Sequence, residues 1–198
     1  WRGAVLGDLR WRIAPLDLFR GRLGAHVTLT RPDGRIESDV AATLAGNLRL
    51  DDTRVDLPVA ALGVLPVGLP KGWRGKLHAE LAELELAKGW PVSVRGTIDM
   101  DGLVAPPPRN ASIGSYHAVL PDPKSQSKQD AGLSARVTDK EGPFAVDGRL
   151  TLAQDRSFLL EGTLAPRGDT PPALRRSLEL LGPADSAGRR QFGVSGTI

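Results

Sequence analysis

The sequence predicts a mainly β fold: a curved antiparallel sheet of repeated strands, forming a sandwich or a half-open groove, with one or two short helices. Apolar and polar residues alternate along most of the chain, as in strands with one face on a core and the other in water. The triplets Gly-x-Leu and Gly-x-Ile recur at spacings of roughly 20 to 30 residues, about two short strands with their turns. Helical periodicity is confined to short segments.

Composition narrows the possible classes of protein. A chain of 198 residues suits one β domain, so we expect 1–198 to form a single domain, with a possible internal break at 105–112. The net charge is +3, but no basic run is interleaved with aromatic residues, so we expect no nucleic-acid partner. The chain has no cysteine, which excludes disulfides and thiolate metal sites.

The N-terminal part predicts four strands. Leu9, Trp11 and Ile13 alternate with arginines, and period-two runs follow at 23–30 and 36–40. Between these runs, the segment 31–34 (Arg-Pro-Asp-Gly) has the chemistry of a tight turn. Leu48 and Leu50 continue the sheet.

The middle of the chain is less regular. Segment 58–65 is a weak helical candidate, and 76–88 fits either a helix or a strand with a bulge. Because 76–88 opens with the same Gly-Lys-Leu pattern as other strands, we predict a strand there, and another at 92–100. The proline-rich or polar segments 105–112 and 121–131 are predicted loops.

Alternation is clearest between residues 132 and 165, where three period-two runs joined by short turns predict an antiparallel meander with one wet face. After it, Leu174, Leu178 and Leu181 have helical spacing. A hydroxyl before this segment, prolines in its first turn and Gly182 after it predict a short capped helix.

We find no pattern that predicts a catalytic, cofactor-binding or metal site. The histidines His26, His78 and His117 lie far apart in sequence, and His26 and His78 fall on the polar sides of predicted strands, where a solvated imidazole is expected. The segment 99–102 (Asp-Met-Asp-Gly) lacks the remaining ligands of a calcium loop, and a strand ending in a turn explains it better. Ser125 and Lys128 have the spacing of a serine acylase motif without its partner motifs, so we expect no enzyme.

The repeated glycines have a structural explanation. A glycine inside a strand marks a bulge, a bend or the close approach of another backbone. Repeated once per hairpin, such glycines would curve the sheet and give it a concave apolar face.

Three stretches resemble the type II secretion system protein N family. The first is Gly3, Gly7, Leu9, Trp11, Ile13, Pro15, Leu18, Phe19 and Gly21, and the second is Ile113, Gly114, Ser115 and Tyr116. The third is Leu178, Leu181, Gly182, Asp185, Gly188, Arg189, Phe192, Val194, Ser195, Gly196 and Ile198. These stretches lie at both ends and in the middle, so the resemblance covers nearly the whole chain.

The resemblance implies the periplasmic domain of a single-pass bacterial inner-membrane protein, with a transmembrane anchor upstream of Trp1. It implies an accessory structural component of the type II protein secretion apparatus. Its partners would be inner-membrane platform proteins or the outer-membrane secretin. No catalytic residue and no cofactor are attributed to this family. The alternative is a module that binds or transports a lipid or another hydrophobic ligand in a concave β groove.

The C-terminal run 192–198 is short, uncharged and free of proline. Two interpretations follow. The run pairs internally and closes the sheet, as chain termini commonly do, or it offers a free edge to a strand from a partner.

Overall fold

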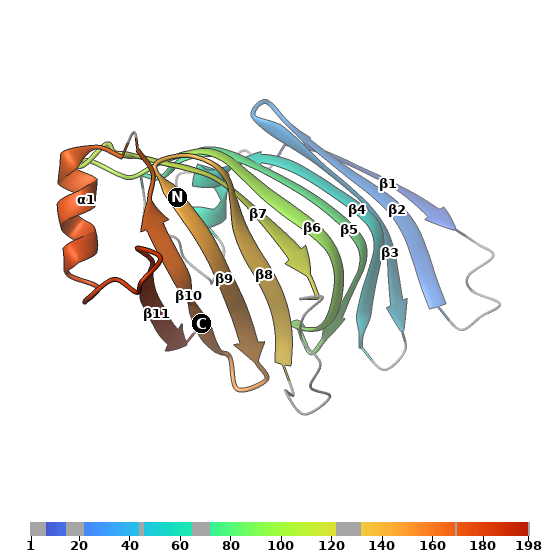
Figure 1. Cartoon of the computed structure of the whole chain (residues 1–198). Helices are drawn as coiled ribbons and strands as arrows, with labels where there is room; N and C mark the ends of the chain where they lie inside the picture. Colours follow the sequence, from blue (N-terminus) through green and yellow to red (C-terminus); the bar gives the residue numbers. More distant parts are fainter. Residues whose placement is uncertain are drawn as a thin grey trace.

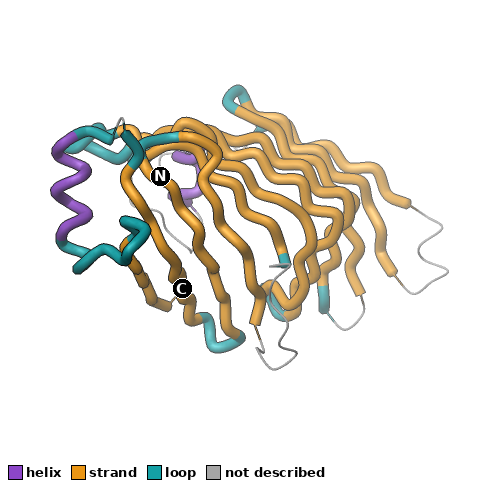
Figure 2. The backbone as a smooth tube through the Cα atoms, in the orientation of Figure 1, coloured by secondary structure: helices purple, strands orange, loops and turns teal. Residues whose placement is uncertain are grey.

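The structure is a computed structural model that describes residues 7–14, 22–43, 46–64, 72–121, 132–168 and 170–197. In these residues one antiparallel sheet of eleven strands runs in chain order from β1 to β11. Figure 1 shows that the sheet is open and curled into a trough, and Figure 2 shows how little of the backbone is helical. The predicted mainly β fold is confirmed, in its half-open form.

The elements follow each other along the chain without crossovers. The strands are β1 (Asp8–Ala14), β2 (Arg22–Arg31), β3 (Gly34–Thr43), β4 (Leu48–Pro58), β5 (Arg74–Ala87), β6 (Trp90–Val104), β7 (Ser112–Leu120), β8 (Gly132–Glu141), β9 (Phe144–Ala153), β10 (Ser157–Pro166) and β11 (Arg190–Thr197). The described helices are a 3-10 helix, η2 (Val59–Val64), and an α-helix, α1 (Pro172–Glu179).

The strand predictions hold at most positions. A two-residue turn, Pro32 and Asp33, joins β2 to β3, with Arg31 opposite Gly34. The ambiguous segment 76–88 is a strand, and the register of β5 against β6 shifts between Leu81 and Glu83, as a bulge requires. The weak helical candidate at 58–65 is the 3-10 helix η2.

Curvature comes from interruptions of the ladder. Register shifts occur in the β3–β4, β5–β6, β6–β7 and β7–β8 pairings, and bulges bend a strand and increase its twist. Gly96, in one such strand, has φ +152°, and a Cβ there would lie 2.1 Å from the carbonyl oxygen of Glu80. Gly162 has equally little space, so the predicted close approach of backbones at repeated glycines is confirmed at both positions.

One sequence prediction on the middle of the chain is wrong, and one strand was missed. The strand does not end in a turn at 99–102, because β6 continues to Val104 through a register shift between Met100 and Leu103. Gly102 supplies the φ of +59° that this irregularity needs. Strand β7 was not predicted, because a register shift between Ser112 and Gly114 leaves Ile113 without a direct partner and Val119 lies on the side opposite Tyr116 and Ala118, so the alternation is blurred.

The predicted capping of the C-terminal helix is also wrong. Residue Pro171 occupies the N-cap of α1, and no side chain there makes a capping hydrogen bond. The hydroxyl of Thr170 instead donates to the carbonyl of Pro143, which ties the start of the helix to the turn between β8 and β9. The proline in the first turn and Gly182 after the helix, with φ +97°, agree with the prediction.

One of the two predicted loops lies within the described residues and the other does not. Residues 105–111 join β6 to β7, which pair directly with each other, so this segment is a connection within the sheet. Residues 122–131, including Ser125 and Lys128, lie outside the described part of the chain.

Candidate functional site: an uncovered apolar sheet face

One face of the sheet, here called the inner face, is apolar across all eleven strands. Directly paired residues share a face, so the register identifies a row that crosses the whole sheet. From β1 to β11 this row is Leu9, Leu29, Ile36, Val55, Ala79, Ile98, Ala118, Val137, Gly148, Gly162 and Phe192. This row is therefore apolar from one edge of the described sheet to the other.

Among the described residues, helix η2 packs against the middle of this surface. Val59 of η2 is 1% exposed and forms the core with Leu77 of β5 and Leu103 of β6. Partly buried residues packed against this core are Val55, Leu62, Trp73, Ile98, Met100, Ile113 and Tyr116. Full burial of a side chain such as Val59 stabilises the folded state by about 1.5–3 kcal/mol, so η2 stabilises the curled centre of the sheet.

A polar pair interrupts the inner face beside the core. The hydroxyls of Ser38 on β3 and Thr53 on β4 lie 2.7 Å apart, and both residues are 4% exposed. The pair sits where the β3–β4 register shifts. Because both hydroxyls are buried, each depends on the other for a hydrogen bond among the described residues.

No described segment covers the β1 end of the inner face. Leu9, Trp11 and Ile13 of β1 are 51%, 66% and 59% exposed, and the adjacent Leu23 of β2 is 57% exposed. Large apolar side chains gathered at this exposure typically mark a contact surface. At the opposite end, Val194 of β11 is also exposed.

The other face of the sheet, here called the outer face, is polar and charged. A second row across all strands runs Asp8, Thr30, Arg35, Asp56, His78, Asp99, His117, Thr138, Asp147, Thr163 and Gln191. Acidic and basic residues alternate in its centre, an arrangement that stabilises cross-strand pairs and keeps this face in water.

Each of the three histidines faces one aspartate directly across a strand pair of the outer face. The Nδ1–Oδ1 distances are 2.8 Å for His26 and Asp39, 2.6 Å for His78 and Asp56, and 2.9 Å for His117 and Asp99. An ionised carboxylate only accepts hydrogen bonds, so the ring nitrogen donates in each pair. The polar placement predicted for His26 and His78 is confirmed.

Hydrogen bonds and neighbouring charges shift the pKa values of several residues on this face. The hydrogen bond to Asp56 raises the pKa of His78, against a smaller opposing effect of burial. Burial would raise the pKa of Asp99, but hydrogen bonds from His117 and Lys140 outweigh it, and that pKa is lowered. Lys140 binds Asp101 at 3.0 Å and Asp99 at 3.1 Å, and these hydrogen bonds raise its own pKa.

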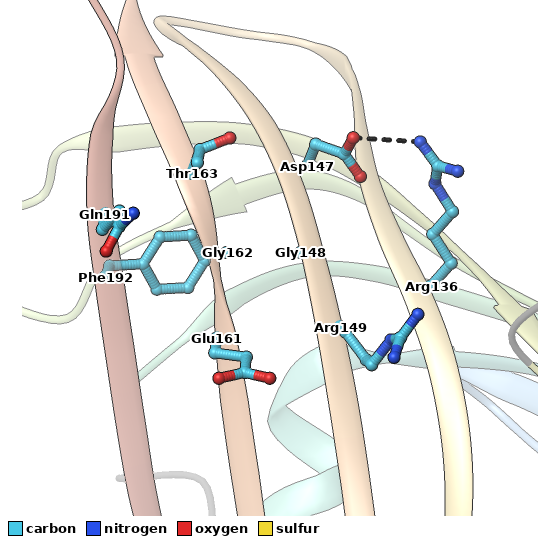
Figure 3. Close-up of a pocket in the computed structure, with 9 residues that line it drawn as sticks. All are labelled: Arg136, Asp147, Gly148, Arg149, Glu161, Gly162, Thr163, Gln191 and Phe192. Atoms are coloured by element: carbon cyan, nitrogen blue, oxygen red, sulfur yellow. Dashed lines mark hydrogen bonds and ion pairs between the residues drawn. The ribbon is translucent and has the colours of Figure 1, made fainter. Parts of the chain in front are cut away.

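A shallow hollow of about 480 Å³ lies on the outer face above β8–β11. The backbone of the directly paired Gly148 and Gly162 forms part of its floor, and Figure 3 shows polar side chains on these two strands and on β8 and β11. Arg136 on β8 donates to Asp147 on β9 at 2.9 Å at one side of this hollow. Gly148 and Gly162 are inner-face positions, where the ring of Phe192 lies 3.4 Å from a Cβ built at Gly148, so the walls of the hollow are the outer-face side chains that flank the two glycines.

The described residues contain no group of three potential metal ligands. The histidine–aspartate pairs occur on three different strand pairs, so the structure does not bring the three imidazoles together at one site. No described helix is long and apolar enough to cross a membrane.

The C-terminal strand shows features of both sequence interpretations. Strand β11 pairs with β10 from Ser157 opposite Thr197 to Leu164 opposite Arg190. It does not close the sheet, because β11 is the last strand in the order and pairs with no second strand among the described residues. Both edges of the described sheet, β1 and β11, are thus open.

An open curled sheet with an uncovered apolar face and a charged outer face defines a β-groove protein, whose chemistry lies in its surfaces. Residues 1–193 match the family model for type II secretion system (T2SS), protein N. The chain belongs to that family and is a component of type II secretion. No curated protein and no solved structure matches the chain.

Proposed function

We propose that this chain is the periplasmic domain of an accessory structural component of the type II secretion apparatus and acts through protein–protein contacts. In this proposal residues 1–198 form a single domain, and a transmembrane helix upstream anchors it in the inner membrane. Inner-membrane platform proteins or the outer-membrane secretin are its partners. It works as a contact surface, without catalytic residues or cofactors.

The observation that supports this proposal is the uncovered β1 end of the inner face. Trp11 is 66% exposed, and its strand, β1, has a row of backbone N–H and C=O groups without a partner among the described residues. An apolar surface next to an open sheet edge favours association with another chain, because both side chains and backbone gain partners on binding.

Site-directed photo-crosslinking in cells with an intact secretion operon tests the proposal. A photoreactive residue is placed in the full-length protein at positions over both faces and both edges of the sheet. We expect crosslinks to a secretion component that disappear when that component is deleted. Crosslinks only to lipid, from every position, would contradict a role through protein contacts.

A second candidate function is the binding of a lipid or another hydrophobic ligand. The observation in its favour is the continuous apolar row of the inner face, of which η2 covers the middle among the described residues. Native mass spectrometry of the purified protein separates the two functions. A co-purifying lipid that is lost when inner-face leucines are replaced by serine would favour the carrier, whereas a ligand-free protein would favour the contact role.

A further inference from the structure

Strand β1 is the edge of the sheet that carries large apolar side chains. In the described part of the chain β1 pairs only with β2, from Asp8 opposite Thr30 to Ala14 opposite Gly24. In an antiparallel edge strand, the N–H and C=O groups of alternate residues point away from the sheet. The second edge of β1 can therefore accept another strand.

The side chains of β1 are divided strictly between the two faces. Leu9, Trp11 and Ile13 lie on the inner face and are more than half exposed, and Arg10 and Arg12 lie on the outer face. Natural edge strands are usually protected by inward-pointing charges, prolines or short length. Strand β1 has seven residues, and its inner-face side chains are all apolar, so it has the features of a binding edge.

The other edge is a weaker candidate. Strand β11 has glycine at 193 and 196, and among its outer-face residues Gln191, Ser195 and Thr197 none is charged. It offers Val194 as its exposed large apolar side chain. Aromatic residues dominate the energetics of protein interfaces, and at the described edges the exposed one is Trp11 on β1.

The charges on β1 indicate what kind of strand would pair with it. Arg10 and Arg12 are exposed on the outer face, and the guanidinium of Arg10 forms an ion pair with the carboxylate of Asp8 at 3.0 Å. Opposite charges directly across a strand pair are stabilising, and like charges are destabilising. A strand with Asp or Glu on its outer-face side therefore fits this edge.

A second copy of this chain fits poorly. Two β1 strands paired antiparallel about Trp11 would place Arg10 of each copy opposite Arg12 of the other. Pairing of β1 with the free edge of β11 would offer the arginines no carboxylate, because the outer-face residues of β11 are uncharged.

We propose that β1 accepts an added strand from another protein, an amphipathic segment with apolar residues on its inner-face side and carboxylates on its outer-face side. This inference rests on the proposed contact function and specifies its site and partner chemistry. The added strand extends the inner face by one strand and covers Trp11.

The test is photo-crosslinking of the full-length protein in secreting cells from the two ends of β1, Asp8 and Ala14. Each crosslinked partner residue is identified by mass spectrometry. We expect both crosslinks in one partner segment, about six residues apart, because paired strands advance in step. The sequence between the two sites should alternate apolar and acidic residues.

Charge reversal distinguishes pairing from general proximity. Arg12→Glu should lower the yield of these crosslinks about tenfold, since an attractive contact becomes a repulsive one. Arg176→Glu, an equal charge change on the exposed face of α1 at the other end of the molecule, should leave the yield unchanged. Reversal of the facing acidic residue in the partner to Lys should restore the yield with Arg12→Glu.

Several outcomes would overturn this inference while leaving the proposed function intact. They are crosslinks to a secretion component from other surfaces but not from β1, crosslinks between copies of this chain, and equal losses for Arg12→Glu and Arg176→Glu. Trp11-dependent binding of the purified protein to phosphatidylglycerol vesicles, without any crosslinked partner segment, would assign the edge to a membrane surface instead. Melting temperatures of both variants establish that each is folded.

Discussion

Replacing Gly162 by Ala tests whether the repeated glycines permit the sheet to curl. A Cβ at this position would lie 2.4 Å from the carbonyl oxygen of Asp147 and 2.6 Å from Cα of Gly148, both in the backbone of β9. Ordinary contacts are about 1 Å longer, so β9 and β10 must separate. Overpacking of this kind costs about 1–3 kcal/mol, and we expect the upper half of that range because backbone atoms must move.

The matched control is Gly193→Ala on the adjacent strand. Gly193 lies opposite Glu161, and a Cβ there meets nothing within 4 Å. We expect no loss, or a gain of about 0.4–1 kcal/mol from the stiffer unfolded chain.

Urea unfolding, monitored by circular dichroism, measures both variants against the parent protein. Gly162→Ala should lower the midpoint while the slope m stays constant, because the surface exposed on unfolding is unchanged. In a chain of this size the loss corresponds to about 4–12 °C in melting temperature. Equal stability of the two variants would refute the reasoning, since it would mean that β9 and β10 do not need a glycine to pack.

Three further predictions concern the centre of the sheet. Ser38→Ala should lower the free energy of unfolding by about 1–3 kcal/mol, because it leaves the buried Thr53 hydroxyl without its partner. The double variant Ser38→Ala with Thr53→Val should recover most of that loss. Additive losses in a double-mutant cycle would argue against the pairing. Leu77→Ala should cost about 2–5 kcal/mol by opening a cavity under η2, and a loss below about 1 kcal/mol would mean that η2 does not pin the sheet. Because the folded-state pKa of His78 is raised, its pair with Asp56 should add stability below the unfolded pKa of about 6.5, and that stability should disappear as the pH rises through the folded pKa. The effect should stay below about 1 kcal/mol at this exposure, and Asp56→Asn should remove it; an unchanged pH profile of unfolding in Asp56→Asn would contradict the assignment.

The local pattern of residues was sufficient to predict the faces of most strands. Side chains alternate with period two, so a run such as 144–152 shows which residues share a side before any partner strand is known. A short turn also makes it possible to predict which residues of the two strands pair. The two-residue turn after Arg31 places His26 opposite Asp39, a pair that could have been found from the sequence by counting back from the turn.

Pairings across long or irregular connections could not be predicted in that way. His78 and Asp56 are joined through η2 and residues 65–73, and His117 and Asp99 through the proline-rich segment and two register shifts. Each bulge changes the count by a residue, so the register there depends on where the bulges fall. The missed strand β7 lies in this part of the sheet.

The sequence by itself determined that the chain would form a strongly alternating, curved β sheet, and its motifs pointed to the family. The tertiary structure decided which part of the apolar face is covered. Leu77 and Trp11 both occupy inner-face positions of alternating strands, yet Leu77 is buried beneath η2 and Trp11 is exposed at the sheet edge. A period-two pattern specifies the side to which a residue points, whereas its burial depends on what another segment packs against that side.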